Sequence, residues 1–309
     1  MQISVQSGGL VSNVGPEAGY RMIREAGFTA IDWNIDSSLN RAGMKKLPLE
    51  NLCIFERPLD EVMAYFADQL THIRKNGLTI TQAHAPFPAY MLERPETLDY
   101  SIGLYRRCIE LCDAVGCQNL IVHSISFYGS DYTNTPESIK ALNYRLYGSL
   151  IDVLTKTNVT VCLENLFTSS PKGLLEGACS NPYEAVEYID TLNEMAGKPC
   201  FGLCLDTGHL NLLRKDFRVY VPILGQRIKA LHIHDNNGLA DQHLLPYTGT
   251  VNWNDFCQSL HDIGYAGNLS FETFAQVRPD RLNRELIPLF LRTICGVGEY
   301  FRARITEAN

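Results

Sequence analysis

Eight short runs of apolar and β-branched residues alternate along the chain with longer runs whose apolar residues recur every three or four positions. The run at 159–163, Val-Thr-Val-Cys-Leu, is continuous and β-rich, as in a strand buried on both faces. The run at 59–74 has the spacing of a helix that lies on a sheet. Strands are therefore expected at residues 2–6, 30–34, 79–84, 119–123, 160–164, 202–206, 230–234 and 268–272.

Helices are expected between these strands, because start and stop signals stand at the right places. Gly27 and Gly77 each occur just before a strand, where a helix needs a left-handed cap. The helices begin near Pro16, Leu59, Pro95, Thr135, Asn181, His209 and Asn252, and a last one runs from Arg281 onward. Eight strand–helix pairs in 309 residues predict an α/β fold, a (β/α)8 TIM barrel that forms a single domain over residues 1–309.

The alternative fold is an open, doubly wound parallel sheet. That fold usually carries a glycine-rich dinucleotide loop after its first strand. Here Ser7-Gly8-Gly9 followed by Gly15 matches that fingerprint poorly. The barrel is therefore the more economical prediction.

The composition of the chain excludes some classes of protein. The net charge is −7, which argues against a nucleic-acid partner, since proteins that grip the phosphate backbone usually present a basic face. No stretch approaches the roughly 18 apolar residues of a membrane span. The N-terminus reads as a strand and shows no signal peptide. Ten cysteines without a signal indicate free thiols and a cytoplasmic location.

Polar residues end six consecutive predicted strands. Active sites of these barrels lie at the carboxyl ends of the strands, where side chains converge on the barrel axis. One constellation is therefore expected from residues that span nearly 190 positions. Its members are His84, His123, Glu164, Asp206, His232, His234 and Glu272.

The stretch from 232 to 243 is the densest part of this constellation. It holds three histidines and two aspartates, at His232, His234, Asp235, Asp241 and His243. Alternation along the strand puts His232 and His234 on one face, and one of them suffices as a ligand. Imidazole and carboxylate groups crowded at a strand end are typical of a divalent metal site. Three converging carboxylates would repel one another without a cation, so a bound metal is predicted.

These residues resemble the xylose isomerase-like barrels, which include sugar isomerases and epimerases, inosose dehydratase and endonuclease IV. The resemblance covers nearly the whole chain. It rests on the segments Glu164-Asn165, Asp206-Thr-Gly-His209, His232-Ile-His-Asp235, 249–253 and Ser270-Phe-Glu-Thr273.

The resemblance implies one of two ligand sets. In the epimerase type, Glu164, Asp206, His232 and Glu272 hold one Mn, Co, Mg or Zn ion, the two glutamates move the proton, and His209 contacts the substrate. In the endonuclease IV type, up to three zinc ions use five further ligands. These are His84, His123, His209, Asp241 and His243.

The leading functional hypothesis is a metal-dependent sugar isomerase or epimerase. It would act through an enediolate, by proton transfer at a carbon next to a carbonyl. The first alternative is a keto-sugar dehydratase or lyase, with His209, His123 or His84 as the acid. The second is a trinuclear zinc phosphodiesterase acting on abasic DNA, and the third is a carbohydrate-binding barrel without catalysis.

Further residues are candidates for substrate contact. Trp33, Phe87 and Arg278 are the primary ones, within a wider group of aromatics that includes Tyr90, Phe127, Tyr128 and Phe167. The expected partner is a small carbohydrate. Two long connections, at 37–58 and 167–180, are expected to be lids, binding loops or oligomer contacts. The resemblance also implies a homo-oligomer.

Overall fold

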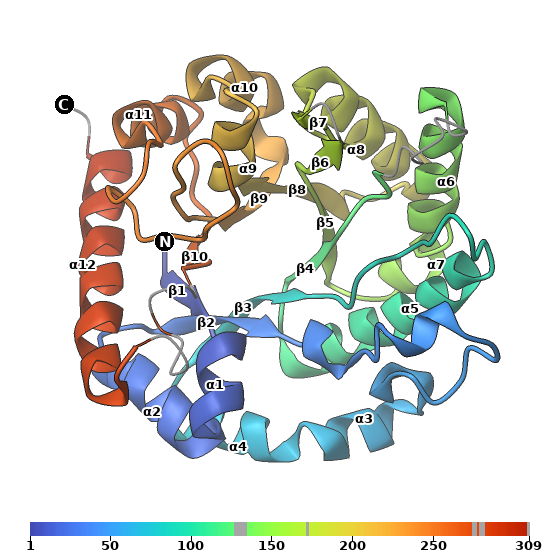
Figure 1. Ribbon diagram of the computed structural model, residues 1–309, viewed down its shortest axis with the longest axis horizontal. Coiled ribbons are helices and arrows are strands. Elements are labelled where there is room, and N and C mark those ends of the chain that lie inside the picture. The colour runs from blue at the N-terminus through green and yellow to red at the C-terminus, as the bar shows by residue number, and fades with distance from the viewer. Residues whose placement is uncertain (127–134, 171–172, 274–276, 278–281, 308–309) are drawn as a thin grey trace.

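The computed structural model describes residues 1–126, 135–170, 173–273, 277 and 282–307. Within these residues, eight parallel strands form one sheet in the order β10-β1-β2-β3-β4-β5-β8-β9. Figure 1 looks along the barrel, with the strands at the centre and the helices around them. The strands are β1 (Ile3–Gln6), β2 (Ala30–Asn34), β3 (Thr79–His84), β4 (Asn119–Val122), β5 (Thr160–Glu164), β8 (Phe201–Asp206), β9 (Ile228–His232) and β10 (Leu269–Phe271).

The sheet closes on itself. The first and last strands are neighbours, with Val5 opposite Phe271. At the other seam, a parallel bridge joins Ile233 to Phe271, and the Ile233 amide donates to the Ser270 carbonyl at 2.8 Å. The (β/α)8 barrel is thus confirmed, and the open doubly wound sheet is excluded because its edge strands would remain unpaired.

Helices surround the barrel. They are α1 (Gly8–Val14), α2 (Pro16–Glu25), α3 (Leu59–Tyr65), α4 (Ala67–Lys75), α5 (Thr97–Val115), α6 (Pro136–Gly148), α7 (Ile151–Leu154), α8 (Pro182–Ala196), α9 (Thr207–Leu212), α10 (Phe217–Leu224), α11 (Trp253–Asp262) and α12 (Ile287–Thr306). None of the helices in the described part is both long and apolar enough to span a membrane.

Local signals at the helix ends act as the sequence predicts. Gly27 and Gly77 follow their helices with φ of 108° and 62°, a region that side chains rarely adopt. The Asn181 side chain accepts a hydrogen bond from the Tyr183 amide at 3.0 Å and begins α8, with Pro182 in the first turn.

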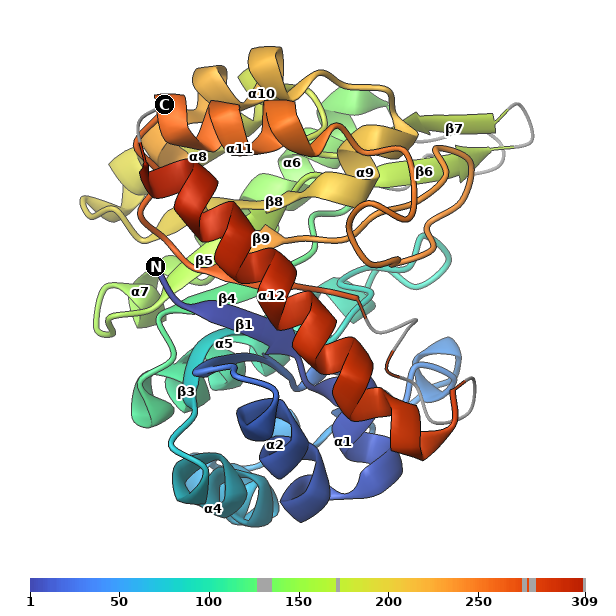
Figure 2. The same ribbon diagram turned by 90° about the vertical axis from the view of Figure 1, so that its left-hand side faces the viewer.

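One connection holds structure that the sequence pattern did not predict. Residues 167–180 contain a β-hairpin, made of β6 (Phe167–Ser170) and β7 (Gly173–Glu176). Figure 2 shows this hairpin projecting from the barrel on the side where α9 and the loop after β9 lie. The polar composition of the segment hides the hairpin, because both of its strands are largely outside the apolar core.

The barrel interior explains where the polar residues must stand. A small buried cluster of Ile121, Cys162, Cys204 and Ala230 fills the barrel from four adjacent strands. Successive side chains of a strand alternate between its two faces. The inward positions two residues further along β5, β8 and β9 are therefore Glu164, Asp206 and His232. All ten cysteines lie in the described part; they are free, as the sequence predicts, and the structure shows that all of them are buried.

Candidate metal centre

Three carboxylates surround one nitrogen of His232 at the end of the barrel. The Nδ1 atom lies 3.2 Å from Glu164 Oε1, 3.6 Å from Glu272 Oε2 and 3.9 Å from Asp206 Oδ2. Glu164, Asp206 and His232 are at most 1% exposed, and Glu272 is 8% exposed. The four residues predicted to share one ion thus meet at one buried point, although they come from four different strand ends.

The second ring nitrogen of His232, Nε2, meets a carboxylate that the sequence analysis did not identify. Its Nε2 atom lies 3.3 Å from Oδ2 of Asp32, which is fully buried in β2. Gln82 holds the same oxygen through Nε2 at 2.8 Å. This carboxylate favours the proton on Nε2 of His232 and leaves Nδ1 free to bind a metal, as in other carboxylate–histidine–metal sites.

Glu272 is also held in place by a neighbouring side chain. The side chain of Gln6, at the end of β1, donates from Nε2 to Glu272 Oε1 at 2.9 Å. Gln6 and Asp32 each carry a signal that could have marked them, since Gln6 is a polar residue at the end of β1 and Asp32 is a charged residue in the middle of β2. Their partners lie 266 and 200 residues away along the chain, so the pairing itself is not visible in the sequence.

Two residues of the Asp-Thr-Gly-His segment, Asp206 and Gly208, have defined structural roles. Asp206 caps α9, because its Oδ1 accepts from the His209 amide at 2.7 Å. Asn165 exchanges two hydrogen bonds with the Asp206 backbone, at 2.8 and 2.9 Å, and ties the ends of β5 and β8 together. At Gly208 a Cβ atom would lie 2.0 Å from Cε1 of His234, so a side chain there would require the His234 ring to move.

His234 approaches the same centre from one side. Its Nε2 lies 3.0 Å from Oδ2 of Asp206, and its ring stacks on His243 with centroids 4.1 Å apart. Asp206, His234 and Glu272 can share one ion, and so can His234, Asp241 and His243, because the potential ligand atoms in each group lie within 4.8 Å of one another. The structure therefore brings to Asp206 both His232, at the end of β9, and His234, two residues beyond it.

The extended ligands also gather. His84, His123 and Glu164 form a third such group, in which the His123 Nε2 to Glu164 Oε2 distance is 3.0 Å. His209 belongs to a fourth group with Glu164 and Asp206. Its Nε2 also lies 3.7 Å from Asp241 Oδ2.

Asp235 does not take part in these groups. Its carboxylate is fully buried and accepts four hydrogen bonds, from the amides of Asn236, Gly249 and Val251 at 2.9–3.0 Å and from the Trp253 indole at 3.1 Å. A Cβ at Gly249 would lie 2.3 Å from Asp235 Oδ1. Asp235 thus anchors both ends of the loop that carries Asp241 and His243, and it is a structural residue.

The carboxylates differ in their protonation. Burial raises the pKa of Glu272 to about 8. Burial also acts to raise the pKa of Glu164, but the electrostatic and hydrogen-bond interactions with the His232 and His123 imidazoles outweigh burial and hold that pKa well below its usual value. Burial lowers the pKa of His84 to about 3, and the electrostatic interaction with the neighbouring His123 acts in the same direction. In the metal-free protein at neutral pH, Glu164 is ionised and His84 is neutral.

His209 has the opposite shift from His84. Burial lowers its pKa, but the carboxylates of Asp206, Asp241 and Glu164 outweigh burial and raise the pKa to about 10. A protonated His209 is therefore balanced by the surrounding negative charge. The ring is also held at Nδ1, which lies 2.9 Å from the Asn165 carbonyl.

The donor set fits a divalent cation. Imidazole nitrogens and carboxylate oxygens are the ligands that zinc and manganese prefer. Oε2 of Glu164 is buried without a well-aligned hydrogen-bond donor in the described part, although the His123 ring nitrogen is near it. Buried polar atoms without hydrogen bonds are costly, and a cation satisfies a carboxylate oxygen directly.

Two adjacent compartments open beside this centre. The polar compartment has a volume of ≈ 500 Å³ and is lined by charged and amide groups together with His84, Glu164, Asp241, His243 and Glu272. The apolar compartment has a volume of ≈ 260 Å³. Its lining residues are Phe87, Pro88, Ala89, Tyr90, His123, Ser124, Ile125, Ser126, Leu166, Phe167, Thr168 and His209. Phe87, His123 and His209 line both compartments and separate them.

Trp33 does not reach either compartment. The prediction that it contacts the substrate is therefore wrong. Its side chain is fully buried, and its indole donates to Gln69 Oε1 at 2.9 Å and packs on Phe66 with ring centroids 4.9 Å apart. The reason is the alternation along β2, because Asp32 faces the barrel axis and its neighbour must face the outer helices. Phe127, Tyr128 and Arg278 lie outside the described residues.

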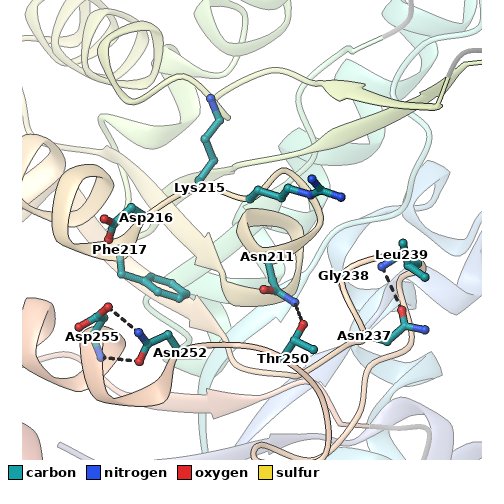
Figure 3. A pocket seen from close by; sticks show the side chains of 11 residues that line it. Asn211, Lys215, Asp216, Phe217, Asn237, Gly238, Leu239, Thr250, Asn252 and Asp255 are labelled. Atoms are coloured by element: carbon teal, nitrogen blue, oxygen red, sulfur yellow. Dashed lines mark hydrogen bonds between the residues drawn. The ribbon is translucent and has the colours of Figure 1, made fainter.

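A separate hollow lies behind the loop that carries Asp241 and His243. Figure 3 shows its lining, which includes Asn211, Thr250 and Asn252. Its volume is ≈ 550 Å³, and two pairs of its polar side chains bind each other, Asn211 with Thr250 at 2.9 Å and Asn252 with Asp255 at 2.6 Å. None of the predicted site residues is among its lining residues in the described part.

A family model for the xylose isomerase-like TIM barrel matches residues 20–293. A closed barrel with a carboxylate–histidine centre at its strand ends defines this class of protein, and the chain belongs to the xylose isomerase-like TIM barrel family.

Several proteins are similar to this chain in sequence. The uncharacterized protein y4fM of Sinorhizobium fredii is 26% identical over 265 residues, which cover 82% of this chain and 79% of that protein. D-psicose 3-epimerase of Enterocloster bolteae is 23% identical over 230 residues, with coverages of 73% and 72%. A probable endonuclease 4 of Mesoplasma florum is 30% identical over 149 residues, but the match covers only 47% of this chain and 45% of that protein.

Solved structures share the fold over nearly the full length. D-psicose 3-epimerase from Clostridium cellulolyticum H10 with D-tagatose superposes with a TM-score of 0.70 at 13% identity, covering 97% of this chain and 99% of that chain. The 3-keto-D-glucoside 4-epimerase from E. coli has a TM-score of 0.68 at 16% identity, covering 98% and 99%. At these identities the likeness establishes the fold alone.

Proposed function

We propose that this protein is a metal-dependent epimerase or isomerase of keto sugars. The observation that carries the proposal is the buried ring of Glu164, Asp206 and Glu272 around Nδ1 of His232, with all three carboxylates within 3.9 Å. The ketose 3-epimerases among the relatives support a carbohydrate substrate. When bound by these four residues, a divalent ion supplies Lewis-acid stabilisation of negative charge on substrate oxygens.

Glu164 and Glu272 are the groups that move the proton. They stand on strands that lie on different sides of β9, and both line the polar compartment. One carboxylate removes the proton from the carbon next to the carbonyl, and the other returns it. Return to the opposite face of that carbon gives epimerisation, and return to the neighbouring carbon gives aldose–ketose isomerisation.

His209 contacts the substrate in this proposal. It lines both compartments, and its ring is fixed by the Asn165 carbonyl and by Asp241. A held imidazolium there donates a hydrogen bond to a sugar hydroxyl. If the β-oxygen leaves after proton removal, the same residue protonates the leaving group, and the outcome is the dehydratase or lyase reaction.

The charge of the polar compartment favours a neutral sugar over a phosphorylated one. Its described lining holds the carboxylates of Asp36, Glu164, Asp241 and Glu272, whereas Arg41 is its one Lys or Arg among the described residues. The Arg41 guanidinium is already paired with Asp36 at 2.8 Å. A phosphate group would have to compete with that carboxylate for its charge partner.

A phosphodiesterase acting on abasic DNA is the second candidate. The grouping of His84 and His123 with Glu164, and of Asp241 and His243 with His234, favours it because these groups suit further ions. The acidic lining speaks against it, since binding of the DNA backbone draws on lysine and arginine. The match to endonuclease 4 proteins also covers only about half of this chain.

The test combines metal content with solvent exchange. The protein is purified without chelator, its metals are counted by mass spectrometry, and D-psicose, D-tagatose, D-fructose and 3-keto-glucosides are incubated with it in D2O. We expect a tightly bound divalent ion and deuterium at a carbon next to the carbonyl. Cleavage of an abasic oligonucleotide is measured in parallel.

Glu164→Gln tests the site itself. We expect at least a 10³-fold loss of exchange, because one proton-transfer group and one ligand charge are removed together. Glu194→Gln makes the same change on the exposed face of α8 and should leave exchange intact. Normal exchange by Glu164→Gln, or DNA cleavage without any exchange on sugars, would overturn the proposal.

A further inference from the structure

The apolar compartment is unsuited to a sugar ring. Its buried wall includes Ala89, Tyr90, Ile125 and Leu166, each at most 8% exposed. Sugar hydroxyls placed among such side chains would lose hydrogen bonds to water without replacing them. A free ketose therefore belongs in the polar compartment and leaves the apolar one unused.

Two of the four hydroxyl-bearing residues that line the apolar compartment, Ser124 and Ser126, are hydrogen-bonded to the protein. Ser124 Oγ is hydrogen-bonded to the Tyr147 hydroxyl at 2.9 Å, and Ser126 Oγ accepts from the Ala178 amide at 2.8 Å. The two serines contribute to the wall, and their hydrogen bonds are directed into the protein. The compartment thus offers mainly carbon surface to an occupant.

Aromatic rings stand where the two compartments meet. Phe87 lies against His123 with ring centroids 4.6 Å apart, and Phe167 lies against His209 at 5.0 Å. The Arg41 guanidinium covers the Phe87 ring at 3.8 Å from its centroid. Each of these phenylalanines is therefore fixed beside a histidine of the candidate site, so an occupant of the apolar compartment is next to the reacting group.

We propose that the substrate is a keto-glycoside whose sugar occupies the polar compartment and whose apolar, ring-shaped aglycone occupies the apolar compartment between Phe87 and Phe167. The proposal rests on the proposed function and names its substrate class. An apolar cavity of roughly 150 Å³ accommodates a benzene ring. The volume of ≈ 260 Å³ therefore admits an aromatic ring with substituents.

The first experiment measures binding without turnover. Methyl and phenyl D-glucopyranosides, in both anomers, are titrated into metal-loaded protein by calorimetry. Burying a ring of the size of a phenylalanine side chain corresponds to about 10- to 100-fold in affinity. We expect the better phenyl anomer to bind more tightly than the matching methyl glycoside by about that factor. Equal affinities would overturn the proposal.

Ala89 provides the variants, because a larger side chain there fills the apolar compartment. Ala89→Leu and Ala89→Phe should reduce the phenyl-to-methyl affinity ratio, the second to below about 3-fold. Ala64→Phe, on the exposed face of α3, is the matched control and should keep the wild-type ratio. Metal content and the thermal midpoint are measured for each variant. A folded Ala89→Phe protein with an unchanged ratio would refute the assignment.

The second experiment separates this proposal from the proposed function. Methyl and phenyl 3-keto-glucosides are compared for deuterium exchange in D2O. Exchange that favours the phenyl compound in kcat/KM supports both proposals. Exchange at equal kcat/KM overturns the aglycone assignment and leaves the epimerase in place. A phenyl preference in binding, with no exchange on any keto sugar, retains the aglycone compartment and overturns the proposed function.

Discussion

Replacement of Asp235 by asparagine tests whether this aspartate is an anchor or a metal ligand. The carboxylate accepts four hydrogen bonds at 2.9–3.1 Å and is fully buried. An asparagine oxygen can keep two of the four donors, but its amide group would face the other two. Each buried donor left without an acceptor costs about 1–3 kcal/mol.

The expected loss of stability follows from this geometry. Two unpaired donors give roughly 2–6 kcal/mol. A neutral amide is easier to bury than a carboxylate, which moves the net value to the lower half of that range, at about 3 kcal/mol. Because domains are stable by about 5–15 kcal/mol, the variant should fold but unfold at a clearly lower urea concentration.

The assay is urea unfolding followed by metal analysis of the folded protein. We expect the free energy of unfolding to fall by about 3 kcal/mol with an unchanged m-value, and the metal content to persist. Asp190→Asn is the control, because Asp190 is half exposed in its pair with Arg227 and should contribute less than about 1 kcal/mol. A loss below 1 kcal/mol together with loss of metal would show that Asp235 is a ligand.

The remaining predictions concern the centre itself. Asp32→Asn should weaken metal binding by about 10- to 100-fold in a chelator competition, because Nε2 of His232 loses its charged partner; unchanged affinity would contradict this role. Gly208→Ala should cost about 1–3 kcal/mol in urea unfolding, since its Cβ would lie 2.0 Å from His234; a neutral effect would be inconsistent with the packing. Chelation should lower stability by about 2.7 kcal/mol relative to metal at 100 times its Kd, and an unshifted melting curve would argue against a bound ion.

The strand ends show how far sequence reasoning reaches. Glu164 and Asp206 occupy the last positions of β5 and β8 at the residues expected from the pattern. The prediction works because the carboxyl ends of parallel barrel strands share one rim, so convergence follows from the fold alone. The same reasoning placed His84, His232 and Glu272 beside them.

The face of the strand on which each side chain lies was harder to predict from the sequence. Trp33 was expected to contact substrate, but it faces the helices because Asp32 takes the inward position. The polar residue Asp32 in the middle of this strand could have indicated the inward face, but a strand buried on both faces lacks the regular polar–apolar alternation that would make such an assignment routine. Asp235 was likewise read among metal-capable residues, and its role as a loop anchor depends on donors up to 18 residues away.

The sequence by itself determined the barrel, its eight strands and the identity of the residues that gather at one rim, because hydrophobic period and strand-end position are local properties of the chain. The tertiary structure decided which nitrogen of His232 faces the three carboxylates and which residues hold Glu272 and His232 in place. It also decided that the site is divided into a polar and an apolar compartment. These features depend on side chains from distant strands and from the β6–β7 hairpin that meet only after the barrel has closed.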